Sequence, residues 1–218
     1  MDGDKTVSEK IYSELYHEIV THKLKPGQNL TLAMLRKRFN VSHTPIREAL
    51  TRLSSDGLVS YESNKGMKVV EFTDSEIREI FQFTAELEII AMRFCSNAFT
   101  MAPLLNEMKA IISQEENALK NNNIELWGKV SGIFHGLFYK YSGNRFLNEV
   151  AERMGARMEL MSNMYSHKDY DISASITNRQ REIFKAVEAG EFDRAADLIR
   201  AHLQFSMIDV LEMSRSDD

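Results

Sequence analysis

The chain has 218 residues, enough for one large or two small domains that each bury a core. Its 43% hydrophobic and 27% charged residues are typical of a globular protein, and only ten Gly and three Pro indicate long helices with short loops. No apolar run is long enough to span a membrane, and a single cysteine, Cys95, excludes an internal disulfide. The first ten residues do not have the pattern of a signal peptide, so we expect a cytoplasmic protein without a membrane partner.

The first predicted helix begins near residue 7 and is followed by a turn at Lys25-Pro26-Gly27. Thr6 and Glu9 have the spacing of a capping box, in which each side chain bonds the backbone of the other residue. Apolar residues recur at helical spacing on one face: Val7, Ile11, Leu15 and Ile19.

Two further helices are predicted on either side of Asn40-Val41. The first is capped by Thr31, with Leu32, Leu35 and Phe39 facing inward. The second lies in the stretch 41–59, VSHTPIREALTRLSSDGLV, with an N-cap at Ser42 and a helix-ending glycine at Gly57. Its apolar face is formed by Ile46, Ala49, Leu50 and Leu53. A connection of two residues permits only a tight helix-turn-helix, of the kind that binds DNA.

The predicted DNA surface is polar and locally basic. Residues 1–72 carry 11 Lys and Arg against 9 Asp and Glu, whereas residues 73–218 carry 16 against 23. The net charge of the whole chain is −5, but the net charge of its first third is positive. The N–H groups at the N-terminus of a helix, together with nearby cationic side chains, bind the phosphate groups of a DNA backbone. The residues that we expect to contact DNA in this region are Arg36, Ser42, His43, Thr44 and Arg47. The alternative is that these basic residues form an ordinary solvent-exposed face, and charge alone favours that interpretation.

Two short β-prone runs, at 58–61 and 67–70, flank a polar turn and predict a β-hairpin after the recognition helix. A hairpin in this position makes a winged helix. Lys65 and Gly66 fall at its tip, where a lysine can reach a phosphate and a glycine permits close approach of the backbone.

Beyond residue 73 the pattern is helical throughout. Six amphipathic stretches are separated mostly by short breaks, the longest polar loop being 167–173. The predicted fold is therefore mainly α: a winged helix-turn-helix domain over residues 6–72, with a small β-hairpin, and an all-α antiparallel helical bundle over residues 73–213.

The recognition stretch closely resembles the GntR family of bacterial transcriptional regulators, where it commonly reads Val-Ser-Arg-Thr-Pro-Val-Arg-Glu-Ala-Leu. The helical remainder resembles the FadR-type C-terminal (FCD) ligand-sensing domain. The segments that carry this second resemblance are Leu87-Glu88, Phe134-His135, 142–144 and 190–203. The resemblance implies a homodimer that binds operator DNA with an affinity controlled by a small metabolite.

Two departures from the family affect the expected sites. His43 stands where the family commonly has Arg. Because histidine cannot make the bidentate hydrogen bonds with which arginine contacts guanine, we expect the operator preference to differ from that of the family. Many FCD domains hold a divalent metal through one Asp and three His, and the matching positions here are Ser131, His135, Gln180 and His202. Because the carboxylate and one imidazole are replaced, a Zn²⁺ or similar ion is disfavoured, and His135 and His202 are possible remnants.

The expected effector pocket consists of these four positions together with Thr84 and Arg157. Thr84 stands where the family usually carries an Arg, and Arg157 lies among methionines on the fourth bundle helix, although surface ion pairing is its simpler interpretation. The four matched positions offer hydrogen-bond donors and acceptors without a fixed negative charge. The effector would be an organic acid or another metabolite.

Three functions are compatible with these patterns. The first is a ligand-responsive, DNA-binding regulator that acts as a repressor. The second is a metabolite-processing enzyme that uses His135 and His202 and keeps the first domain as a DNA tether. The third is an effector-independent DNA-binding protein. The sequence contains no nucleophile–base motif or phosphate loop, so the regulator is favoured and no catalytic residue is assigned.

Overall fold

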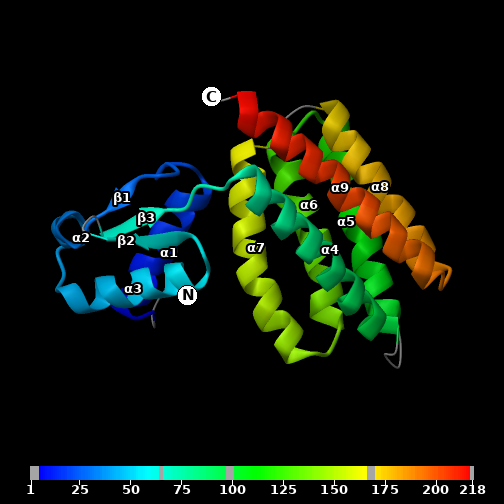
Figure 1. The fold of residues 1–218 in the computed structure, drawn as a ribbon. Helices are drawn as coiled ribbons and strands as arrows, with labels where there is room; N and C mark the ends of the chain where they lie inside the picture. The colour runs from blue at the N-terminus through cyan, green and yellow to red at the C-terminus, as the bar shows by residue number, and fades with distance from the viewer. Residues whose placement is uncertain (1–4, 64–65, 97–100, 166–169, 217–218) are drawn as a thin grey trace. The chain divides into compact units, whose positions relative to one another are not determined.

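The structure, a computed structural model, describes residues 5–63, 66–96, 101–165 and 170–216. The chain forms two compact units (Figure 1). The first consists of residues 1–73 with Glu152–Met164, and the second of Asp74–Ala151 with residues 165–218. Among the described residues, no helix combines the length and the apolar character needed to cross a membrane.

The first unit contains three helices and a small antiparallel sheet, in the order α1, β1, α2, α3, β2, β3. Their bounds are Val7–Val20, Asn29–Leu30, Leu32–Phe39, His43–Ser55, Val59–Glu62 and Gly66–Val69. The predicted hairpin is confirmed as β2 paired with β3. The sheet also has a third strand, β1, which pairs with β3 on the side away from β2, so the strand order is β1-β3-β2.

Local sequence signals explain where the helices of this unit begin and end. Thr6 and Glu9 form the predicted capping box, and the Thr31 hydroxyl accepts a hydrogen bond from the Met34 N–H. Gly57 follows Asp56, the C-cap of α3, and adopts a positive φ of 72°, a conformation that glycine reaches without strain. Val7 was predicted to face inward but is 51% exposed, because the first turn of α1 extends beyond the core that its other apolar residues join.

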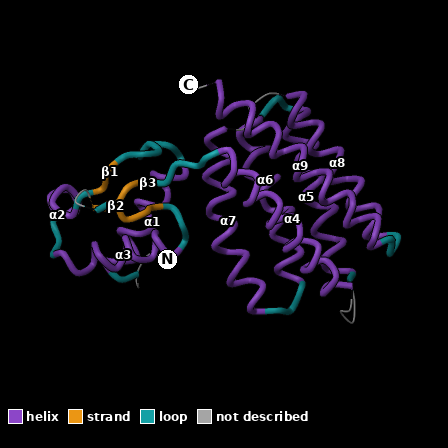
Figure 2. Tube along the Cα trace, viewed as in Figure 1, coloured by secondary structure: helices purple, strands orange, loops and turns teal. Residues whose placement is uncertain are grey.

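The second unit is built from helices, as Figure 2 shows. The helices α4 to α9 span Asp74–Ser96, Ala102–Lys120, Ile124–Tyr141, Arg145–Tyr165, Tyr170–Glu188 and Phe192–Ser216. Within the unit, α4 packs against α9 and α6, and α5 packs against α6 and α8, while α8 also contacts α9. All six predicted segments are therefore confirmed as helices, but most of α7, Glu152–Met164, groups with the first unit and not with the other five helices. The expected polar loop at 167–173 is partly wrong: residues 166–169 lie outside the described residues, but α8 already begins at Tyr170, and Ser173 is completely buried.

Candidate nucleic-acid interface and buried polar cluster

The amino end of α3 is exposed, while its opposite face is buried. Ile46, Ala49, Leu50 and Leu53 have at most 3% of their surface exposed and fix the helix in the core. His43, Thr44 and Arg47 project from the exposed side. Ser42 occupies the N-cap position, but its side chain makes no capping hydrogen bond. The Ser42 hydroxyl and the N–H groups of the first turn are therefore available to a ligand, and such groups suit an anion.

The basic residues of this region divide into two groups. Arg38 donates to Glu14 and Glu18 at 2.6 and 2.7 Å, and the Arg52 guanidinium lies 4.0 Å from the centre of the Tyr12 ring. These two arginines are thus engaged inside the unit. Within the described part of the chain, no ion pair or hydrogen bond occupies the side chains of the remaining cations: Arg36, Lys37 and Arg47.

The tip of the hairpin is described only in part. Lys65, which we expect to contact phosphate, lies outside the described residues. Gly66 begins β3 with a φ of 93°, a left-handed conformation that side chains other than glycine rarely adopt. The glycine is therefore explained by the turn geometry, and its expected closeness to DNA remains a prediction.

In the second unit, the four positions that replace the expected metal ligands lie together as two pairs. His135 of α6 and His202 of α9 approach with their Nε2 atoms 3.2 Å apart, and their rings are stacked at an interplanar angle of 15°. Ser131, one turn before His135, lies with its hydroxyl 3.1 Å from the Gln180 amide of α8. Gln180 is completely buried and His202 is 1% exposed, so this polar cluster is inside the bundle.

Contrary to the sequence-based expectation, the cluster contains negative charge. Glu88 of α4 is 2% exposed and places its two carboxylate oxygens 2.9 and 3.1 Å from Nδ1 of His135. Burial alone would lower the pKa of His135, but the charge and hydrogen bond of Glu88, aided by Glu115, raise that pKa above its ordinary value. The pKa of His202 is lowered well below its ordinary value by burial, and then by the charges of His135 and Arg179.

The opposite pKa shifts favour the charged form of His135 and the neutral form of His202. The Glu88 carboxylate lies within hydrogen-bond distance of Nδ1 of His135, and Nε2 of His135 lies within hydrogen-bond distance of Nε2 of His202. The other ring nitrogen of His202 is Nδ1. That atom is buried and has no hydrogen-bond partner among the residues described here.

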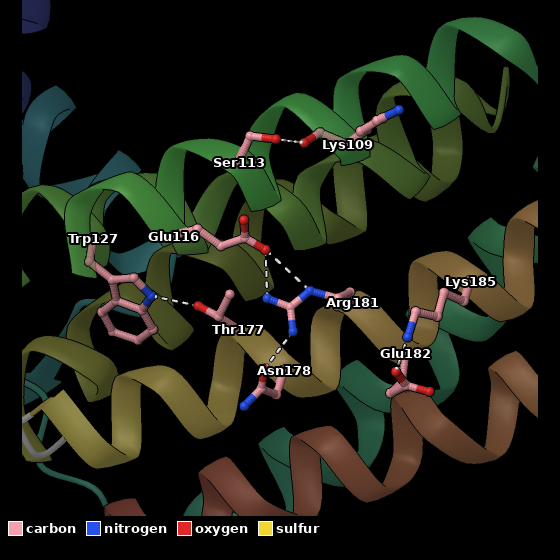
Figure 3. Close-up of polar contacts among 9 residues, drawn as sticks. All are labelled: Lys109, Ser113, Glu116, Trp127, Thr177, Asn178, Arg181, Glu182 and Lys185. Atoms are coloured by element: carbon pink, nitrogen blue, oxygen red, sulfur yellow. Dashed lines mark hydrogen bonds and ion pairs between the residues drawn. The ribbon is translucent and has the colours of Figure 1, made fainter. Parts of the chain in front are cut away.

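Glu115 of α5 is the second carboxylate of the cluster and is completely buried. One orientation of the Gln180 amide gives hydrogen bonds to both its nitrogen and its oxygen. In that orientation the amide nitrogen donates to Oε1 of Glu115 at 2.6 Å, and the amide oxygen accepts from the Ser131 hydroxyl at 3.1 Å. Thr177 also donates to Glu115 and in turn accepts from the indole N–H of Trp127 at 2.9 Å (Figure 3). Burial raises the pKa of Glu115 to about 7, against the lowering effect of hydrogen bonds from Thr177 and Ser131.

The remaining predicted pocket residues have different surroundings. Thr84 of α4 is buried, and its hydroxyl has no partner among the described residues. Arg157 lies in the α7 segment that groups with the first unit, and none of the cluster contacts described above involves it. Sequence reasoning missed Glu88, Glu115 and Arg179. Glu88 was noticed as part of Leu87-Glu88 without a role, and nothing in the periodicity of α5 marks Glu115 as buried.

The cluster does not provide the ligand set of the metal-binding relatives. His135 and His202 offer two imidazole nitrogens, but Glu88 faces the far nitrogen of His135, and Gln180 bonds Glu115 and Ser131. The described residues contain no group of three or more His, Cys, Asp or Glu that could hold a metal ion. The residues present therefore do not fit a metal bound in that way.

An exposed recognition helix beside a small sheet, followed by a helical bundle with a buried polar cluster, defines a DNA-binding regulator with a separate helical domain. Comparison with protein families agrees: residues 7–69 match the gntR family of bacterial regulatory proteins, and residues 79–205 match the FCD domain. The chain belongs to the GntR family of transcriptional regulators, in its FCD-containing branch. Its families and relatives are regulators, so the enzyme alternative is not supported.

Curated relatives extend over nearly the whole chain. An uncharacterized HTH-type transcriptional regulator, YdhC of Bacillus subtilis, is 25% identical over 195 residues, covering 88% of this chain and 86% of the relative. The HTH-type transcriptional repressor GlaR of Escherichia coli is 22% identical over 204 residues, covering 88% and 90%. The solved structure of E. coli McbR/YncC is similar in fold, with a TM-score of 0.77 and 21% identity over 96% of this chain and 99% of that one.

Proposed function

We propose that this chain is a homodimeric, cytoplasmic repressor whose affinity for operator DNA is controlled by a small metabolite bound in the helical bundle. Residues 6–72 form the DNA-binding domain and residues 73–213 the sensing and dimerisation domain. The observation that carries the proposal is the amino end of α3, which is exposed, uncapped by its own Ser42 side chain and adjacent to cations without internal partners. Named repressors among the relatives support the direction of control.

On DNA, α3 would lie in the major groove with its amino end toward the bases. Arg47 would read a base edge, while Ser42 and Thr44 would contact phosphate beside the helix N-terminus. His43 would add a weaker contact, and Arg36 would bind the phosphate backbone. Lys65 and Gly66 of the hairpin tip would approach the backbone of the same site.

The dimer is supported by an apolar stripe on α4. Phe83, Ile90 and Phe94 are 49%, 45% and 44% exposed, and their spacing of seven and four residues puts them on one helical face. Charged residues flank the stripe, as Glu86 does. An exposed apolar stripe with a charged border is the pattern of a protein interface, and a two-fold dimer would place two recognition helices on an inverted repeat.

The effector part of the proposal is tested by thermal denaturation of the purified full chain against a metabolite library. A ligand of the native state raises the melting temperature, by mass action, so at least one metabolite should give a concentration-dependent increase. The same metabolite should lower operator affinity in a gel shift. A chain that binds its operator but responds to no metabolite would be the effector-independent regulator instead.

A further inference from the structure

The carboxyl-terminal part of α7 belongs to the DNA-binding unit, although it is far from that unit in the sequence. Residues 145–151 of this helix group with the second unit, whereas Glu152–Met164 group with the first. Ala156 and Leu160 are 6% and 0% exposed, and both belong to the hydrophobic core that contains the buried face of α3. A segment of α7 therefore completes the core on which the recognition helix rests.

Two polar residues of the same α7 segment also contact α1 and the end of α3. Glu159 accepts a hydrogen bond from the Tyr16 hydroxyl of α1 at 2.5 Å. The Arg157 guanidinium lies against Gly57, and a Cβ atom built on that glycine would overlap it. Because Gly57 follows the C-cap residue of α3, Arg157 places its positive charge beside the carboxyl end of the recognition helix. A cation is favoured there, since the aligned peptide dipoles leave the carboxyl end of a helix partly negative.

The charge of Arg157 is not neutralised by another side chain. Among the residues that the structure describes, no carboxylate forms an ion pair with its guanidinium. The helix α3 has 13 residues and behaves as a stiff rod, so a displacement of its carboxyl end changes the direction of its amino end. The amino end is where we expect Thr44 and Arg47 to contact DNA. A contact at Gly57 can therefore control recognition without touching DNA.

We propose that Arg157 is a positioning residue for operator recognition, which holds the carboxyl end of α3 and thereby sets the direction in which Thr44 and Arg47 meet the bases. Ala156 and Leu160 anchor α7 in the core, and Arg157 makes the contact with the end of the recognition helix. This inference rests on the proposed function, since it concerns selective binding to an operator.

The DNA experiment compares two duplexes of equal length: an operator selected by the full chain from a random pool, and a scrambled version of it. Arg157→Ala should weaken operator binding by about fivefold, the size of a favourable contact at a helix end, and should change binding to the scrambled duplex by less than about twofold. The loss of a phosphate contact would instead weaken both, because phosphates are common to every sequence. Arg153→Ala is the matched control, since it removes the same charge one turn earlier, at an exposed position of α7. It should keep the wild-type ratio of the two affinities.

A double-mutant cycle tests the contact itself without DNA. In the wild-type background, Gly57→Ala adds a Cβ atom at a positive φ and also overlaps the Arg157 side chain. In the Arg157→Ala background the overlap is absent and only the backbone strain remains. We therefore expect Gly57→Ala to lower the melting temperature less in the Arg157→Ala background than in the wild-type background.

The outcomes separate this inference from the proposed function. A wild-type affinity ratio in folded Arg157→Ala, an equal loss on both duplexes, an equal loss in Arg153→Ala, or an equal effect of Gly57→Ala in both backgrounds would overturn the inference and leave the proposed function standing. A wild-type chain that selects no operator would overturn the proposed function itself. If Arg157→Ala does not fold, Arg157→Gln keeps much of the side-chain length without the charge and replaces it in both experiments, with the same expected and contrary results.

Discussion

Arg47→Ala should weaken binding to operator DNA by about 1–3 kcal/mol, which corresponds to roughly five- to 150-fold in Kd. Arg47 projects from the exposed face of α3, and no residue in the described ranges occupies its guanidinium. Its removal therefore costs little folding energy, while it deletes a side chain able to bond a guanine through two N–H groups. Fluorescence anisotropy with a labelled operator at moderate, fixed salt measures the change.

Arg52→Ala is the matched control for Arg47→Ala, because both arginines lie on α3. The Arg52 guanidinium packs on the ring of Tyr12, so its loss should alter stability more than operator affinity. The melting temperatures of both variants show whether each folds. Wild-type Kd in folded Arg47→Ala, or an equal loss of affinity in both variants, would contradict the assigned role of α3.

The second large effect concerns the pH dependence of stability. Burial raises the pKa of Glu115 from its ordinary value of 4.5 to about 7, so the folded chain holds this proton more tightly than the unfolded chain does. The stability that Glu115 contributes is then fully present below pH 4.5 and is lost as the pH rises toward 7. A shift of this size corresponds to about 3 kcal/mol.

Glu115→Gln should remove this dependence, because the amide does not titrate. Between pH 5 and pH 8, the wild-type chain should therefore lose about 3 kcal/mol of unfolding free energy relative to the variant in urea titrations. His135 and His202 are present in both proteins, so the difference between the curves reports Glu115 and its coupling to His135. Glu116→Gln, at the exposed neighbouring position, is the control. Parallel curves for wild type and Glu115→Gln would show that Glu115 is not buried in this way.

The parts that could be predicted from sequence are those that local patterns determine. The apolar face of α3, its end at Gly57 and the capping box of α1 follow from residues a few positions apart. The strand β1 was missed because it has two residues and exists only through pairing with β3, nearly 40 positions later, as in Leu30 with Met67. A strand of two residues is too short to show the alternation of apolar and polar residues by which strands are predicted.

The buried cluster shows a different limit. Family resemblance selected four of its positions, and the structure places them in two contacting pairs. Glu88 and Glu115 were not predicted because a glutamate on an amphipathic helix usually faces water, and only the packing of α4, α5 and α6 shows that these two do not. Arg179 was missed for a related reason. Nothing in the sequence distinguishes it from Arg181, which finds a partner on α5.

Footprinting tests directly whether a two-fold dimer reads DNA with two recognition helices. Hydroxyl-radical footprinting of the wild-type chain, on DNA selected by the protein from a random pool, reports which backbone positions are covered. We expect two protected half-sites in inverted orientation, their centres about one helical turn or a multiple of it apart. A single protected half-site, or uniform protection without any selected sequence, would contradict the account.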